Sequence, residues 1–306
     1  MSKKEQPSHP GSNFPDQLEP PKLAVDRPVV TRPLTVAYLS DPNVYARALL
    51  RLKALRDRGD RVWHIPTVPL QPQSRGSVAL PLWQKLARRL GIHPDVTDAR
   101  KALLALARST RLDLIWIDWG MTIDRRTIEA AKTASGALAV AFSEDDIALP
   151  HMQSRRLVKA LPAYDLVVTT KIANIQTRDL ETIGARKVLY VTQAFDPHQH
   201  FPVPLSDADR AACGADISFV GFFEEARAQS IMALAQAGLP VRVWGPRWAG
   251  KLAHPNITLE PGWIVNTQTS LDYSKVLTAS KIRLGFLRRL SRDQHTSRSV
   301  EIPACG

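Results

Sequence analysis

The segment RDQHTSRSVEIPACG, residues 292–306, brings cations, a histidine and carboxylates together in a short stretch. Thr296 or Ser297 can cap a helix that begins near Arg298. The free backbone N–H groups and the dipole at the start of a helix favour an anion. The segment therefore predicts an anion site built from His295, Thr296 and Arg298. A basic surface turn followed by a capped helix would show the same helix-start pattern, and this alternative stays open.

The charge of the whole chain also points to an anionic partner. Its net charge is +12 at pH 7, which suits nucleic acid, an anionic membrane surface or a phosphorylated small molecule. We find no recognition-helix signature, no RNP-like aromatic strand and no compact basic arm, so nucleic-acid binding is the least favoured of these.

Other classes of protein are disfavoured by composition. No apolar run approaches the roughly 18 residues that a membrane span needs, and the N-terminus lacks the apolar core of a signal peptide. We therefore expect a cytoplasmic protein. The two cysteines, Cys213 and Cys305, form no CxxC or Cys/His cluster, so neither a disulfide framework nor a zinc site is predicted.

Strands and helices alternate along most of the chain. Residues 34–198 contain the apolar runs LTVAYLS, RVWHIP, LDLIWIDWG, ALAVAFS, YDLVVTTK and KVLYVTQAF, with amphipathic segments between them. Such alternation predicts a parallel, doubly wound sheet whose ligands bind at the carboxyl ends of the strands. Residues 199–215 are expected to be a linker, and the alternation restarts in 216–306 as a second α/β domain. Residues 1–33, rich in Pro, Ser and charge, are expected to be a disordered leader.

Carboxylates follow a strand in the first domain. FSEDD places Glu144, Asp145 and Asp146 after the ALAVAFS strand, where mutual repulsion can raise a pKa toward a useful base value. They can equally cap the next helix. Asp118, after LIWI, faces the same edge, and no Ser, Cys or His arrangement predicts a covalent nucleophile.

Two glycines follow strands in the second domain. Gly221 comes after DISFV and Gly245 after LPVRVW, and glycine lets the backbone approach a phosphate closely. A glycine at such a position can equally be required by the turn itself, without any ligand. Arg227, one turn into the next helix, can reach a phosphate or stand in solvent. Trp244 and Trp248 offer either stacking surfaces or core packing.

Several sequence segments in the second half closely resemble those of one protein family. DISFVGFFEEAR, LPVRVWGPRW, SKIRLGFLRR and RDQHTSRSVEIPACG are similar to the CgeB-like spore-maturation glycosyltransferases, a bacterial branch of the GT-B, family-1-like group. FSEDD, YDLVVTTK and GARKVLYVTQAFDPHQHFP extend the resemblance over about 34–306. It implies a GT-B-like α/β fold of two Rossmann-like parallel-sheet domains. The second domain would be incomplete, because the family runs on beyond EIPACG through a further strand and closing helices.

The resemblance also implies an activity: a hexosyltransferase-type enzyme that moves a sugar from a nucleoside-diphosphate donor to an acceptor hydroxyl. In this group an acidic residue and a glutamate separated by seven residues lie beside the donor, and Asp293 and Glu301 have that spacing. Glu301 would accept two hydrogen bonds from the ribose diol. No metal or other cofactor is implied, because such enzymes stabilise the leaving diphosphate with basic side chains and helix dipoles.

The expected donor-binding residues are Gly221, Arg227, Gly245, Asp293, Thr296, Arg298 and Glu301, and the expected catalytic residues are Asp145, Asp146 and His295. The acceptor is left open. One alternative is a catalytically inactive truncated fragment or a nucleotide-sugar-binding module. A distant third is a nucleic-acid-binding protein.

Overall fold

The structure is a computed structural model that describes residues 31–71, 81–260, 262, 264–267, 270–288 and 291–306. Nearly all of the expected leader, residues 1–30, lies outside these ranges. Residues 33–306 form one compact unit that contains two sheets. Among the described helices, none has the length and apolar character to cross a membrane.

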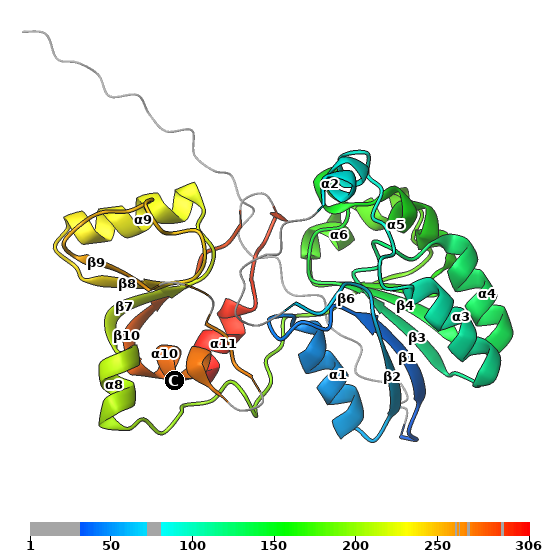
Figure 1. Cartoon of the computed structure of the whole chain (residues 1–306), viewed down its shortest axis with the longest axis horizontal. Coiled ribbons are helices and arrows are strands. Elements are labelled where there is room, and N and C mark those ends of the chain that lie inside the picture. The colour runs from blue at the N-terminus through cyan, green and yellow to red at the C-terminus, as the bar shows by residue number, and fades with distance from the viewer. Residues whose placement is uncertain (1–30, 72–80, 261, 263, 268–269, 289–290) are drawn as a thin grey trace, which may run out of the picture. The chain divides into compact units, whose positions relative to one another are not determined.

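The first sheet has six parallel strands in the order β2-β1-β3-β4-β5-β6 (Figure 1). Their bounds are β1 Thr35–Ser40, β2 Arg61–Pro66, β3 Leu114–Asp118, β4 Leu138–Ser143, β5 Leu166–Thr169 and β6 Val188–Tyr190. The inner strands β1, β3, β4 and β5 are nearly continuous apolar runs, which is typical of a parallel sheet.

Helices cover this sheet unequally. They are α1 Ala48–Asp57, α2 Leu82–Arg89, α3 Ala99–Ser109, α4 Arg125–Ser135, α5 Arg155–Ala160, α6 Ile172–Gln176 and α7 Asp179–Thr182, with short 3-10 turns at Pro150–Met152 and Leu161–Ala163. The larger core lies on the face under α3, α4 and α5. On the other face α1 packs over β1, with Leu52 against Val36 and Tyr38.

The second sheet has four parallel strands in the order β10-β7-β8-β9. They are β7 Ala215–Val220, β8 Val241–Trp244, β9 Ile257–Glu260 and β10 Ser280–Leu284. The helices of this part are α8 Asp207–Cys213, α9 Glu225–Gln236, α10 Asp272–Ala279 and α11 Arg298–Ala304. A core under α9 covers one face, and a core with α10 and α11 covers the other (Figure 1).

Two parallel sheets, each with helices on both faces, confirm the predicted α/β class. Within the range expected to be a linker, residues 199–215, the structure places α8, which starts with a capping box between Ser206 and Asp209. Trp244 and Trp248 are both buried in the cores of the second sheet, so core packing accounts for both.

Candidate functional site

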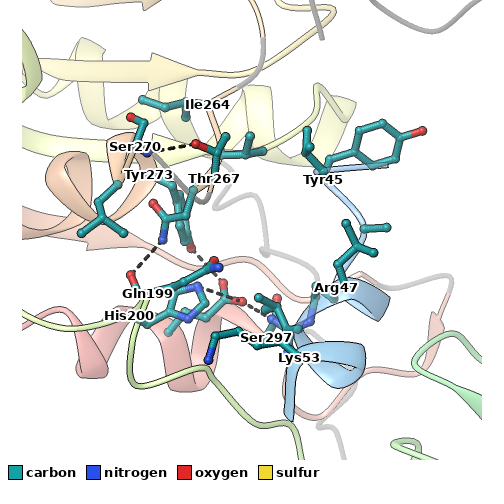
Figure 2. A pocket seen from close by; sticks show the side chains of 18 of the residues that line it. Tyr45, Arg47, Lys53, Gln199, His200, Ile264, Thr267, Ser270, Tyr273 and Ser297 are labelled. Carbon is teal, nitrogen blue, oxygen red and sulfur yellow. Dashed lines mark hydrogen bonds and ion pairs between the residues drawn. The ribbon is translucent and has the colours of Figure 1, made fainter. Parts of the chain in front are cut away.

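A cavity of about 1210 Å³ opens at the carboxyl ends of β7 and β8. Four residues predicted for donor binding line it: Gly221, Gly245, Arg298 and Glu301. Figure 2 shows Arg47 and Lys53 on one side of this cavity and Thr267 and Tyr273 on another. The carboxyl edge of the second sheet is therefore where the predicted residues gather, as expected for an open parallel sheet.

The two glycines are required by the backbone itself. Gly245 has φ +139°, and a Cβ there would lie 2.1 Å from the carbonyl oxygen of Gly221. The Gly221 N–H donates to the carbonyl of Trp244 at 2.9 Å, and a Cβ on Gly221 would meet the ring of Phe219 at 2.7 Å. The close approach of these strand ends explains both glycines without a ligand.

Glu301 is the buried centre of the site. Its side chain is 3% exposed, and its Oε2 accepts from Tyr273 Oη at 2.9 Å and from Arg298 Nη1 at 2.6 Å. Arg47 Nη1 donates to Oε1, and His200 Nε2 lies 3.8 Å from the same oxygen. Burial opposes ionisation, but Arg298 and Arg47 outweigh it and hold the pKa of Glu301 below its usual value. Glu301 is thus a buried carboxylate that stays ionised because Arg298 and Arg47 pair with it.

The side chains around Glu301 have protonation states that are consistent with a charged carboxylate. Burial lowers the pKa of His200, with Glu301 acting against that change, so the imidazole favours its neutral form. Burial also raises the pKa of Tyr273, which keeps its hydroxyl as a donor to Glu301. The Arg298 guanidinium stacks over the Tyr273 ring, 4.7 Å from its centroid.

The helix α11 begins at Arg298, where the sequence predicts it. Ser297 is the N-cap residue, but its side chain makes no capping hydrogen bond. The Thr296 backbone N–H instead donates to Ser299 Oγ at 3.1 Å. Arg298 and Ser297 line the cavity, whereas Thr296 is outside its lining.

A second group of predicted residues lies around Lys171. Asp293 forms an ion pair with Lys171, and the two side chains are 4% and 6% exposed. His295 Nε2 accepts from the backbone N–H of Gln193 at 3.4 Å. Burial raises the pKa of Asp145, with Lys171 acting in the opposite direction. The lining of the 1210 Å³ cavity includes none of the three predicted residues, so the predicted site is divided into two neighbouring parts.

Asp146 and Arg227 are both engaged elsewhere. Asp146 is fully buried, and its two oxygens accept from Arg292 at 2.6 and 3.0 Å. Arg227 donates to the carbonyl of Phe222 at 3.1 Å and pairs with Glu224 at 3.2 Å. Of the two aspartates predicted as a base, Asp145 is the one without a guanidinium clamp among the hydrogen bonds of the described residues.

The sequence reasoning missed four polar residues of these sites: Arg47, Lys171, His200 and Tyr273. Lys171 follows β5 almost directly, so the rule that ligands meet the carboxyl ends of parallel strands could have found it. Arg47 immediately precedes α1, near the end of β1. His200 and Tyr273 carry no local signal, because only the tertiary packing places them beside Glu301.

Arg47 connects the cavity to the acidic segment after β4. Besides Glu301, its guanidinium donates to Glu144 at 3.0 Å and to the carbonyl of Ala194 at 2.6 Å. Arg51 also binds Glu144, at 3.0 Å, and Asp118 at 2.7 Å. Within the described residues, no group of three or more His, Cys, Asp or Glu side chains is arranged to hold a metal ion.

Comparison with known proteins identifies the type of fold. No family model matches the chain, and no curated protein matches its sequence. A solved alpha-glucosyltransferase in complex with UDP and a 13-mer DNA containing an HMU base is similar, with a TM-score of 0.55 and 12% identity over 89% of this chain and 78% of that one. A second alpha-glucosyltransferase complex, with UDP and a 13-mer DNA containing a central A:G mismatch, gives 0.52 and 12% over the same shares. Sucrose-phosphate synthase from Thermosynechococcus elongatus gives 0.47 and 12%, over 81% and 74%. The first two likenesses show that the fold is that of the GT-B glycosyltransferases.

Proposed function

We propose that the chain is a glycosyltransferase that moves a sugar from a nucleoside-diphosphate donor to an acceptor hydroxyl. One observation carries the proposal. In a GT-B fold, one cavity at the carboxyl ends of β7 and β8 collects the close glycine pair and the ion pair between Arg298 and the buried Glu301. We place the donor in this cavity and assign it to a CgeB-like branch on the sequence resemblance. The expected cytoplasmic location and the expected absence of a metal stay predictions.

The geometry of Glu301 suits a ribose. Each carboxylate oxygen has two lone pairs. Tyr273 and Arg298 use those of Oε2, whereas Oε1 accepts from Arg47 and keeps one for a ribose hydroxyl. A second ribose bond would require the Arg47 guanidinium to move toward Glu144, which it already binds.

The arginine side chains of the cavity can stabilise the negative charge of the leaving diphosphate. When the acceptor oxygen attacks the anomeric carbon, the bond from that carbon to the diphosphate breaks and the diphosphate leaves with the electron pair. Arg298 and Arg47, whose side chains are 31% and 22% exposed, would stabilise that charge as cations already held in place by Glu301. Gly221 and Gly245 line the same cavity, so the diphosphate would lie beside the ends of β7 and β8.

A base must take the proton of the acceptor hydroxyl. Asp145 is our candidate, because burial raises its pKa toward the working range of a general base. It adjoins Glu144, which Arg47 joins to Glu301. His295 and Asp293, on the same side as Lys171, are proposed to contact the transferred sugar.

Donor binding tests this proposal directly. We would follow thermal unfolding with UDP-, GDP- and TDP-sugars for the natural chain and for Glu301→Ala. A donor at a hundred times its dissociation constant should add about 2.7 kcal/mol to the folded state. Glu260→Ala, which removes a carboxylate of β9 paired with Arg242, is the matched control and should keep the effect. Equal stabilisation of Glu301→Ala and Glu260→Ala, or none of any chain, would contradict the proposed donor site.

Turnover separates an enzyme from a binding module. Release of the free nucleoside diphosphate, with the sugar found on an added acceptor, is expected of the enzyme. Donor binding without release would favour the nucleotide-sugar-binding module. Because the two alpha-glucosyltransferase structures contain DNA, oligonucleotides belong among the acceptors tried. A salt-dependent shift of an oligonucleotide would revise the expectation of no nucleic-acid partner.

A further inference from the structure

The helix α2 has an apolar side that stays exposed. Leu82 is 83% exposed, Trp83 57% and Leu86 59%, and Leu90, the C-cap residue, is 54% exposed. Residues four apart lie on the same side of a helix, so Leu82, Leu86 and Leu90 form one stripe, and Trp83 adjoins it. The structure describes all eight residues of α2, and none of them is buried. The apolar side of α2 is therefore a candidate interaction surface and not part of a core.

The opposite side of α2 is cationic. Lys85, Arg88 and Arg89 are all exposed, and their spacing of three and four residues again gives them a common side. The sequence contains no Asp or Glu between Asp60 and Asp95. Within the described residues, no carboxylate forms an ion pair with these three cations. Their charge is thus available to an anionic partner.

The start of α5 adds two more cations beside the end of α2 (Figure 1). The backbone N–H of Arg155 donates to the carbonyl of Gly91 at 2.9 Å, and Arg156 Nη1 donates to the carbonyl of His93 at 2.6 Å. Burial lowers the pKa of His93, and Arg88 and Arg156 lower it further, as expected where cations gather. The apolar side of α2 is thus bordered by cations from two helices.

This pattern is typical of helices that lie in the plane of an anionic membrane surface. The apolar side chains of such a helix enter the boundary between headgroups and acyl chains, and its Lys and Arg side chains bind the lipid phosphates. Trp is enriched at the same depth. A helix of eight residues is about 12 Å long, against about 30 Å for the hydrocarbon of a bilayer. The helix α2 would therefore lie along the surface.

Other partners fit this surface less well. Nucleic acid would pair with the cations but would leave the exposed Leu and Trp side chains without an apolar partner. A stable protein interface takes about 20–30 residues on each side, far more than the apolar side of α2 supplies. A second copy of this chain would also bring two sets of cations together, and like charges repel.

We propose that α2 docks the chain on an anionic lipid surface, with its Leu and Trp side chains in the headgroup region and the cations of α2 and α5 on the lipid phosphates. The apolar side chains specify a bilayer and not a soluble phosphate compound, because only the bilayer removes them from water. The inference goes beyond the proposed function and does not depend on it. Of the residues of α2, all within the described ranges, none lines the proposed donor cavity.

Flotation of the whole chain with lipid vesicles tests the inference. Vesicles of phosphatidylcholine and phosphatidylglycerol in equal parts should bind the natural chain. Pure phosphatidylcholine vesicles should bind it at least about tenfold more weakly, because each Lys or Arg near an anionic surface increases the affinity roughly fivefold. Acyl-chain-brominated lipids should quench the Trp fluorescence of the natural chain, and they should quench that of Trp83→Phe less.

Loss of the apolar side should weaken binding. Leu82→Gln combined with Leu86→Gln keeps good helix formers in α2. Affinity for the mixed vesicles should fall at least about tenfold, because both side chains lose the gain of leaving water. Leu138→Gln combined with Leu239→Gln is the matched control. These leucines are 61% and 42% exposed, at the start of β4 and shortly before β8, and the control should bind as the natural chain does.

A charge variant separates a specific surface from the net charge of +12. Lys85→Gln combined with Arg89→Gln should lower the affinity for the mixed vesicles at least about tenfold. Lys187→Gln combined with Arg210→Gln is the matched control, because it removes the same charge from two exposed residues, one just before β6 and one in α8. It should keep most of the binding.

Several outcomes would overturn the inference. They are absence of flotation with the mixed vesicles, and equal binding by the α2 variants and their controls. A dimer of the natural chain that Leu82→Gln with Leu86→Gln dissociates, as measured by sedimentation, would assign the surface to a second copy and overturn it as well. Stabilisation by UDP should be the same in every variant. Loss of that response with vesicle binding intact would remove the proposed donor site alone.

Discussion

Arg292 and Asp146 form a bidentate ion pair, with Nε–Oδ2 and Nη2–Oδ1 distances of 2.6 and 3.0 Å. Arg292 precedes α11 and has a left-handed backbone, with φ +48°. Asp146 follows β4 and is fully buried. The pair therefore ties the segment before α11 to the first sheet. The position of Asp146 is thus explained by a structural role, whereas a general base would have a carboxylate free of such a pair.

Removal of the Asp146 charge should lower the stability of the folded chain. Asp146→Asn removes the charge of a fully buried carboxylate and leaves Arg292, whose side chain is 33% exposed, with a weaker partner, so we expect the free energy of unfolding to fall by about 2–4 kcal/mol. Asp179→Asn removes the other partner of Arg292, whose side chain is 33% exposed, and should cost at most about 1 kcal/mol. Urea unfolding of both variants measures the difference. Equal losses would count against the structural role, and a stable but inactive Asp146→Asn would return Asp146 to the catalytic candidates.

The approach of Gly245 to Gly221 predicts an unequal response to alanine. Gly245→Ala places a Cβ 2.1 Å from a backbone oxygen, so we expect a loss of about 3 kcal/mol together with weaker donor binding. Gly250→Ala is the control, because φ is +71° there but nothing lies within 4 Å of the new Cβ. It should cost about 1 kcal/mol. Thermal unfolding with and without UDP compares them, and similar losses would show that the strand ends are further apart than described.

Glu301 predicts a dependence of stability on acid. Its folded-state pKa is below the ordinary value of 4.5, so its stabilising contribution is complete above 4.5 and is lost as the pH falls through the folded-state pKa. Glu301→Gln lacks this ionisation. Between neutral pH and about pH 3, the natural chain should therefore lose more stability than the variant, as measured by urea unfolding at several pH values. Parallel curves would contradict the assigned shift.

His200 predicts a second dependence at higher pH. Burial lowers its folded-state pKa below the ordinary value of 6.5. As the pH falls below 6.5, the unfolded chain takes up the proton first, and stability falls until the folded-state pKa is reached. His200→Asn should reduce the loss between about pH 7.5 and 5.5. A steeper loss in the variant would mean that the imidazole is protonated in the folded chain, beside Glu301.

The Lys171–Asp293 pair can be tested by a double-mutant cycle. Lys171→Met and Asp293→Leu each leave one buried charge alone, and each should cost about 3 kcal/mol in the free energy of unfolding. The double variant should be more stable than the sum of the two losses predicts, because no charge is stranded. Strict additivity in urea unfolding would show that the two groups do not interact in solution.

Much of the fold was predictable because it depends on local pattern. The LDLIWIDWG and ALAVAFS runs are continuous and apolar, and they became the central strands β3 and β4. The ends of α4 also follow local signals: Asp124 accepts from the Thr127 N–H at 2.9 Å as an N-cap, and Gly136 ends the helix with φ +76°. The order of the strands and the packing of α1 over β1 depend on tertiary contacts, which a single sequence does not state.

The site was predictable only in part, for the same physical reason. Gly221, Gly245, Arg298 and Glu301 meet because strand ends and the start of α11 share one edge. The partners of Glu301 are far away in the chain: Arg47 is 254 residues distant, and Tyr273 is 28 residues distant. The seven-residue spacing of Asp293 and Glu301 did not indicate that Lys171 would bind one and Arg47 the other.

The segment from Arg292 to Glu301 has a consequence for how substitutions would be tolerated. Arg292, Asp293 and Glu301 each bind a residue on the first-sheet side, namely Asp146, Lys171 and Arg47. In a saturation screen for function, changes at these three positions would therefore score as null through loss of folded protein as well as through the site. Second-site suppressors should appear at Asp146, Lys171 and Arg47, where a matching change removes the stranded charge. Three partner positions far apart in the chain would then evolve together with one short segment.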